Sequence, residues 1–411
     1  MIAIEIPKNV KIIINELRKN GYEAYIVGGC VRDAILDKEP NDWDITTSAM
    51  PEDVKRLFNR TIDTGIQHGT VTVMIDKTGY EITTYRIDGE YEDGRHPKEV
   101  IFTRNLYEDL KRRDFTINAM AYNDEDGLVD EFNGIGDLDN KIIRCVGNPE
   151  DRFNEDALRI LRAVRFAANL GFDIDEKTRE AALKLSSNLK KISKERIQTE
   201  LDKLIMSDNP EMLETACELG ITDVVLNEID RLKSEKVLDE VLALTKNMEK
   251  NHYLRWTSLF VYSSREKTKT ILSGLKFDNK TINICSRIVG ALSRKLPETR
   301  AEIRKDIFET GNEIYDVYVR FLKGYLMSEC SKGTGKCGDR EYIDFLQREY
   351  EDIKKNNECT SLKGLAINGK DLMDAGIEKG STIGETLNRL LYAVMEKPEL
   401  NNRKDLLNLL N

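Results

Sequence analysis

Asp42 and Asp44 are the residues whose type and spacing most directly suggest chemistry. Side chains two apart in a strand point to the same side, so a strand here would present both carboxylates together. Two such charges repel each other unless a cation lies between them, and Mg²⁺ prefers a few carboxylates plus the phosphate oxygens of a substrate. The pair therefore predicts a divalent-metal site. An aspartate-rich turn after Pro40, with Asn41 and Asp42 making local caps, is an equally open interpretation of the pair alone.

A glycine pair a few residues earlier suggests a phosphate site. Gly28 and Gly29 end an apolar strand expected over 25–27 and precede a helix expected over 31–36. A helix that begins there presents free backbone N–H groups, and glycine lacks the Cβ that would keep phosphate oxygens away. Arg32, one turn into the helix, would add a forked cation. A tight strand-to-helix connection has the same pattern, but the glycine turn and the carboxylate pair together favour metal-assisted phosphoryl chemistry.

Glu81 is a candidate third carboxylate. It lies on a strand expected over 80–87, which returns after a hairpin turn at 77–79, and Thr83 and Tyr85 share its side of that strand. The alternative is an exposed strand glutamate with no catalytic role.

The first third of the chain alternates between helical and strand patterns, which predicts a mixed α/β domain that positions these side chains. A helix is expected over 7–19. The stretch 86–109 is interrupted by glycines and a proline, so we expect a loop there. The remaining strands are expected over 42–46, 70–76, 119–122 and 142–146.

After about residue 147 the strand patterns disappear and apolar residues recur at helical spacing. This predicts an all-α remainder, with an exposed loop over 330–339. The domain organisation expected from the sequence is a head over 1–147, a helical neck over 148–225 and a helical body and tail over 226–411.

The composition limits the partners and the compartment. With 411 residues and a formal net charge of -10, the chain is no uniformly basic nucleic-acid coat, so a polyanion would have to meet local basic patches. The seven cysteines are scattered and lack the CxxC spacing of zinc or redox sites, which favours reduced thiols and a cytoplasmic location. The three histidines are too far apart for a multi-histidine metal centre, and no stretch reaches a membrane-spanning length.

Five motifs in one order resemble those of class II tRNA nucleotidyltransferases, the bacterial-type CCA-adding enzymes and their poly(A) polymerase relatives, within the DNA polymerase beta superfamily. They are VGGCVRDAILDKEPNDWDITTSA, YRIDGEYEDGRHP, LKRRDFTINAMAYN, RFNEDALRILRAVRFAANLGF and ISKERIQTEL. The resemblance implies an α/β head with a polymerase beta-like nucleotidyltransferase sheet, followed by an all-α neck, body and tail in a hook-shaped molecule.

The resemblance also implies roles for individual residues. Asp42 and Asp44 would hold two Mg²⁺ ions, with Glu81 as the third carboxylate. The incoming triphosphate would be held by Gly28, Gly29 and Arg32. The sugar and phosphates would be contacted by Arg113, Asp114 and Asn118, although a surface ion-pair cluster of Arg112, Arg113 and Asp114 is the alternative.

A helix expected to start at Glu155 has an apolar back and a polar front. Asp156 and Arg159 lie one turn apart on that front, so they could meet the Watson–Crick edge of one base. A carboxylate accepts from the exocyclic amino group that cytosine and adenine have and uracil lacks. This resembles the family's amino-acid template, with Arg162 and Arg165 reaching phosphates or shaping the pocket. The alternative is an ordinary exposed Asp–Arg pair.

The loop EYEDGRHPKEV resembles a flexible loop that the family needs for adding A, and its candidate residues are Asp93, Arg95 and His96. A mobile surface loop without a catalytic duty is the other interpretation. The expected activity is the addition of C, C and A to tRNA from CTP and ATP, with the helical remainder gripping the acceptor and TψC arms. The alternatives are an A-adding enzyme, a poly(A) polymerase and a non-catalytic RNA-binding protein. Neither a membrane nor a protein partner is implied.

Overall fold

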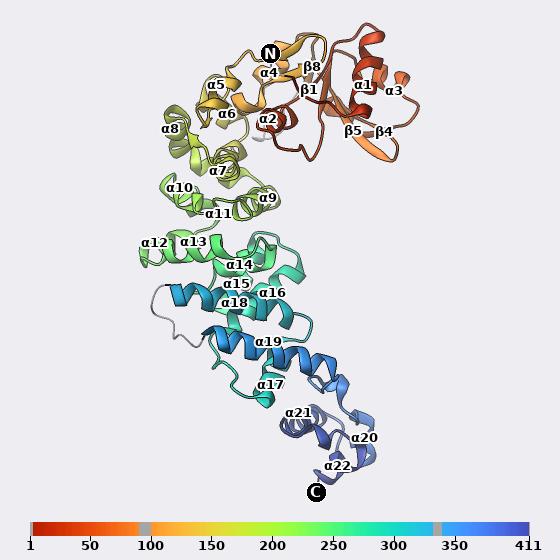
Figure 1. The fold of residues 1–411 in the computed structure, drawn as a ribbon, viewed down its shortest axis with the longest axis vertical. Coiled ribbons are helices and arrows are strands. Elements are labelled where there is room, and N and C mark those ends of the chain that lie inside the picture. The colour runs from red at the N-terminus through yellow and green to blue at the C-terminus, as the bar shows by residue number, and fades with distance from the viewer. Residues whose placement is uncertain (1–2, 90–99, 332–338, 411) are drawn as a thin grey trace. The chain divides into compact units, whose positions relative to one another are not determined.

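The computed structural model describes residues 3–89, 100–331 and 339–410. The chain divides into two compact units, Met1–Lys236 and Val237–Asn411 (Figure 1). The first unit contains the mixed sheet and the helices that follow it, and the second contains only helices among its described residues. The α/β head followed by helical regions, expected from the sequence, is confirmed.

The head is built on a seven-stranded sheet with the order β3-β4-β5-β2-β1-β8-β9. β2 and β5 are parallel and the other neighbours are antiparallel. All residues of β1, an interior strand of the sheet that α1 and α2 contact, are buried. The strands are β1 Ala24–Val27, β2 Ile45–Thr47, β3 Thr61–Gly65, β4 Thr70–Ile75, β5 Thr78–Thr84, β8 Ala121–Asn123 and β9 Gly127–Val129.

Helices α1 and α3 pack on the sheet and on each other, whereas α2 follows β1 directly. On the face of β1 that carries Tyr25 and Val27, Leu110 of α4 closes a small apolar cluster. The head helices are α1 Lys8–Lys19, α2 Gly29–Ile35, α3 Pro51–Leu57, α4 Leu106–Lys111 and α5 Gly134–Asp139.

Several expected boundaries differ from the observed ones. The strand expected over 42–46 begins only at Ile45, so Asp42 and Asp44 lie in the segment that leads into β2. The hairpin turn is centred on Asp76 and Lys77, which both have positive φ, whereas Thr78 already belongs to β5. The stretch expected to be a loop, 86–109, contains two antiparallel strands and the first residues of α4 among its described residues. Its strands are β6 Arg86–Asp88 and β7 Val100–Phe102.

The helices that follow the head complete the first unit. The expected strand over 142–146 is reduced to β10 Ile142–Ile143, which pairs in parallel with β11 Asp173–Ile174 and not with the main sheet. That pair is also an exception to the expected all-α remainder. α7 and α9 pack side by side. The longer helices here are α6 Pro149–Glu155, α7 Leu158–Leu170, α8 Glu176–Leu185, α9 Lys194–Ile205, α10 Met212–Glu218 and α12 Glu228–Ser234.

Among the described residues of the second unit, one hydrophobic cluster is formed by α13, α14 and α16 to α19, and another mainly by the last helices. No described helix is long and apolar enough to cross a membrane. The longer helices are α13 Leu238–Asn247, α15 Arg265–Gly274, α16 Asn279–Ala291, α17 Arg300–Thr310, α18 Tyr315–Ser331, α19 Asp339–Lys355 and α21 Ser381–Glu396.

Candidate active site

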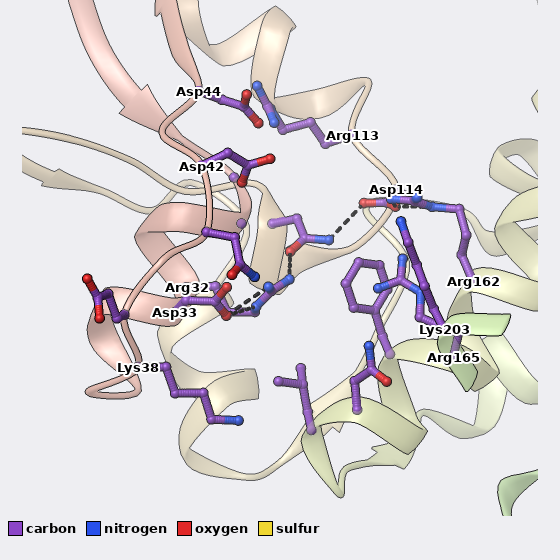
Figure 2. A pocket seen from close by; sticks show the side chains of 18 residues that line it. Arg32, Asp33, Lys38, Asp42, Asp44, Arg113, Asp114, Arg162, Arg165 and Lys203 are labelled. Atoms are coloured by element: carbon purple, nitrogen blue, oxygen red, sulfur yellow. Dashed lines mark hydrogen bonds and ion pairs between the residues drawn. The ribbon is translucent and has the colours of Figure 1, made fainter. Parts of the chain in front are cut away.

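A polar cavity of about 520 Å³ lies in the first unit, between the glycine turn of the head and helices α7 and α9 (Figure 2). Most of the residues that the sequence predicted for the site line it. These are Gly28, Gly29, Arg32, Asp42, Asp44, Arg113, Asp114, Asn118, Arg162 and Arg165. The cavity also contains residues that the sequence did not predict, namely Asp33, Lys38, Glu39, Asn41, Phe166, Asn169, Leu170 and Lys203.

Asp42 and Asp44 enter the cavity from the segment before β2. The carbonyl of Asp44 accepts a hydrogen bond from the N–H of Val27 (3.0 Å), which fixes this segment beside β1. The surrounding protein displaces water from the Asp44 carboxylate, and the Asp42 charge repels it, so the pKa of Asp44 is raised to about 6. The carboxylate still has an open face toward the cavity. Two acidic groups in this state favour a bound cation.

Glu81 lies on β5, is exposed and does not line the cavity. Its strand pairs with β2 so that Ile82 lies opposite Ile45, which brings Glu81 near Asp44. Its charge is one of the groups that raise the pKa of Asp44. Its role as third carboxylate stays a prediction.

The glycine turn needs glycine for two reasons. Gly28 has φ of 81°, a left-handed conformation that glycine adopts without strain. A Cβ there would lie 2.9 Å from Nη1 of Arg113, which crosses behind the turn. Arg113 is held in turn by Asp109, a fully buried carboxylate that also accepts from Arg112 (2.7 Å). Burial alone would raise the pKa of Asp109, but the two arginines outweigh burial and lower it. Asp109 is a supporting residue that no motif singled out.

A chain of hydrogen bonds crosses the cavity floor from the head to α7 (Figure 2). Arg32 donates to Asp33 (2.8 Å) and to Asn118 (2.6 Å), and Asn118 donates to Asp114 (3.2 Å). Asp114 also accepts from Arg162 at 2.9 and 2.6 Å. Burial would raise the pKa of Asp114, but the Arg162 charge outweighs it and holds the pKa well below its usual range. The alternative interpretation, a surface ion-pair cluster of Arg112, Arg113 and Asp114, is therefore wrong, since Asp114 is buried and pairs with Arg162.

Glu200 of α9 ties two of the predicted arginines together. It accepts from Arg165 at 2.8 Å and lies 3.4 Å from Arg162. The Arg165 guanidinium lies 3.5 Å from the centre of the Phe166 ring, and burial lowers the pKa of Arg165. Arg32 lies over the same ring at 5.2 Å. The wall that α7 presents to the cavity is therefore a set of arginines fixed by carboxylates and one aromatic ring.

Asp156 and Arg159 do not line this cavity. The expected continuous helix from Glu155 is wrong, because Asp156 adopts an extended conformation between α6 and α7 and its carboxylate accepts from the N–H of Leu158 (3.1 Å). Such a cap competes with helix continuation. Arg196 of α9 donates to both oxygens of Asp156 (3.2 and 2.7 Å), whereas Arg159 pairs with Glu155. Their role in base recognition stays a prediction.

The candidate loop residues Asp93, Arg95 and His96 lie outside the described residues. Among the residues described, no group of three or more His, Cys, Asp or Glu side chains is arranged as a complete metal site. The carboxylates of Asp42 and Asp44 both line the cavity, and two hard oxygen donors of this kind would fit an ion such as Mg²⁺ that takes its remaining ligands from a phosphate and water.

Three family models match successive parts of the chain. Residues 24–144 match the "Poly A polymerase head domain" and residues 171–233 match the "Probable RNA and SrmB- binding site of polymerase A". Residues 248–410 match domain 2 of tRNA nucleotidyltransferases.

Curated relatives match along nearly their whole length. The CCA-adding enzyme of Limosilactobacillus fermentum is 36% identical over 96% of this chain and 94% of its own. The CCA-adding enzyme of Lactobacillus delbrueckii subsp. bulgaricus is 38% identical over 93% of this chain and 92% of its own. Among solved structures, the Bacillus stearothermophilus CCA-adding enzyme in complex with CTP matches with a TM-score of 0.75 and 32% identity, covering 94% of this chain and 92% of that one.

Proposed function

Because this chain belongs to the family of bacterial CCA-adding enzymes and poly(A) polymerases, which are nucleotidyltransferases, we propose that it adds C, C and A to the 3′ end of tRNA. CTP and ATP are the substrates, pyrophosphate is released, and no nucleic-acid template is used. The observation that carries this proposal is the single cavity in which two aspartates, a glycine turn and four arginines from head and neck converge.

Enzymes of this family depend on divalent metal ions, and we propose that Mg²⁺ is the ion used here. Asp42 and Asp44 would hold it, because both carboxylates face the cavity and the pKa of Asp44 is raised by the Asp42 charge as well as by lost hydration. Glu81 would add to the negative potential from β5. The chemistry that such ions supply when bound is neutralisation of charge on the phosphates and a lower pKa for the attacking hydroxyl.

The residues of the head would orient the triphosphate. Gly28 and Gly29 leave the backbone open to phosphate oxygens, and Arg32 supplies a guanidinium that Asp33 and Asn118 already hold in place. Arg113 crosses behind the turn, toward Asp44, and adds positive charge there. An in-line displacement at the α-phosphorus by the RNA 3′-hydroxyl needs this positioning and no covalent intermediate.

The neck would choose the base. Asp156 is held by Arg196 so that its carboxylate has a fixed direction, and Arg159 is fixed by Glu155. The carboxylate would accept from the amino group of cytosine or adenine, and the guanidinium would meet ring acceptors. Asp114 and Asn118 would contact the sugar, although Asp114 already accepts from Arg162.

The experiment gives the purified protein three tRNA transcripts, ending before, within and after CCA, with labelled CTP and ATP singly and together. Addition of CCA to the shortest transcript, and of nothing to the complete one, is the expected result. Addition of A alone would indicate an A-adding enzyme, and a long A tail a poly(A) polymerase. Binding of tRNA without any incorporation would overturn the proposal.

A further inference from the structure

Two lysines that the sequence did not predict for the site line the cavity from opposite walls. Lys38 follows α2 in the head, and Lys203 lies near the end of α9 (Figure 2). Both side chains are exposed. Within the described part of the chain, neither makes an ion pair or a side-chain hydrogen bond.

The arginines of the cavity are in a different state. Arg32 pairs with Asp33, Arg162 with Asp114, and Arg165 with Glu200. Each of these cations is largely balanced by a carboxylate of the protein, so it contributes shape and hydrogen bonds more than net charge. The two lysines are the cavity cations whose charge no described carboxylate balances by direct contact.

Three carboxylates that line the cavity have no contacting cation among the described residues, namely Asp42, Asp44 and the exposed Glu39, which follows Lys38 in the chain. Asp42 and Asp44 form no ion pair with Lys38 or Lys203, although all four side chains line one cavity. This separation suits a ligand that brings a cation to the aspartates and several negative charges to the lysines. A metal-bound nucleoside triphosphate has that charge distribution.

We propose that Lys38 and Lys203 contact the β- and γ-phosphates of the incoming nucleotide, and thus the pyrophosphate that leaves. This inference rests on the proposed function. Both lysines line the same cavity as Gly28, Gly29 and Arg32, the residues proposed to hold the triphosphate. Lysine is a compact point charge on a flexible stem, so it can stay with a phosphate group that moves away during the reaction.

The test replaces each lysine by methionine, which keeps the length of the side chain and removes its charge. Lys38→Met and Lys203→Met should each raise the KM for CTP and ATP about tenfold, as expected for loss of one charge-assisted contact. The KM for tRNA and the affinity for CMP should stay unchanged, because CMP lacks the β- and γ-phosphates. In the reverse reaction the KM for pyrophosphate should rise by a similar factor, and Lys203→Arg should restore most of the affinity.

Lys19→Met and Lys177→Met are matched controls, since both lysines are exposed on the first unit and outside the cavity. An unchanged KM for both nucleotides, an equal loss of CMP affinity, or an effect confined to the KM for tRNA would overturn the inference. Because all four lysines are exposed, we expect the unfolding midpoints to match the wild type. If the wild-type protein itself transfers no nucleotide, the proposed function fails. If the wild-type protein is active and Lys203→Met has the same KM for CTP and ATP, only this inference fails.

Discussion

One aspartate in the cavity of the first unit and one glutamate in the second unit have their pKa values shifted in opposite directions. Asp44 has no ion-pair partner among the described residues, and lost hydration together with the Asp42 charge raises its pKa to about 6. Glu358 in the second unit would also have its pKa raised by burial, but hydrogen bonds from Arg300 and Arg304 outweigh burial and lower it. Arg304 extends this cluster by donating to the carbonyl of Met395 in α21 (2.5 Å).

This difference distinguishes carboxylates that stabilise the fold through ion pairs from carboxylates that we propose bind a cation. A carboxylate with two guanidinium partners contributes to stability and has little left to offer a substrate. A carboxylate beside another carboxylate costs stability until a cation binds, so it makes sense only where a cation is used. The cavity contains both kinds, because Asp33 and Asp114 are paired whereas Asp42 and Asp44 are not.

The largest effect is expected for Asp42→Ala. Loss of this proposed metal ligand should lower kcat about 1000-fold, because the stabilisation that a bound ion gives the transition state is several kcal/mol. Binding of tRNA and the unfolding midpoint should stay near the wild type, since the substitution removes a repulsion and no ion pair. Single-turnover incorporation of CMP measures the loss of activity, and filter binding measures the affinity for tRNA. Retained activity would contradict the proposed contrast between cation-binding and ion-paired carboxylates, because Asp42 would then be an ordinary surface aspartate.

The second effect concerns stability alone. Glu358→Gln leaves Arg300 and Arg304 without their shared carboxylate, and we expect a loss of about 3 kcal/mol in the free energy of unfolding of the second unit. Urea unfolding measures this loss, with the exposed Glu399→Gln as control. Affinity for CTP should not change. A large change in CTP affinity without a loss of stability would contradict the assignment of this cluster to the fold.

A smaller effect is expected when the direction of hydrogen bonding changes at Asp156. Asp156→Asn introduces a donor where the base is expected to meet only an acceptor, so the preference for CTP over UTP should fall about 30-fold, equivalent to about 2 kcal/mol. Competition between labelled CTP and UTP measures the ratio. The exposed Asp151→Asn on α6 is the matched control. An unchanged ratio would remove Asp156 from base selection.

The smallest effect concerns the pH dependence of stability at Asp114, the paired carboxylate of the cavity. The pKa of Asp114 is lower in the folded protein than its unfolded value of about 3.9, so its ion pair stabilises the fold above that pH and is lost as the pH falls toward the folded pKa. The stability difference between wild type and Asp114→Asn should therefore be constant above about pH 5 and shrink below about pH 4. Urea unfolding at several pH values measures it. A difference that does not vary with pH would mean that Arg162 does not stabilise the charged carboxylate.

The sequence predicted the site best where neighbours along the chain supply it. The glycine turn, Arg32 and the aspartate pair lie within a short stretch, and all of them reach the cavity. Lys203 comes from a helix far along the chain, so only the packing of α9 on α7 brings it to the cavity. Asp156 was placed on a helix because its neighbours have helical periodicity, yet its own carboxylate caps the next turn and interrupts the helix.

The strands of the fold also divide into those that the local sequence predicted and those that it did not. β1 and β4 were predicted within a residue because buried apolar runs define them. β3 was missed because its residues, Thr61–Gly65, are half-buried or exposed at the sheet edge and carry no apolar alternation. β10 was expected to be longer because its apolar residues continue to Val146, but pairing with two residues of β11 ends it early.

The ion pair between Asp114 and Arg162 has a consequence for protein engineering. One partner belongs to the sheet-bearing segment and the other to α7, so a chimaera that joins this N-terminal segment to helices from a relative inherits only half of the pair. If the donor helix lacked an arginine at the position of Arg162, the graft would bury an unbalanced aspartate. Crossover points placed after residue 205 keep both partners, and Glu200 with them, in one parental sequence.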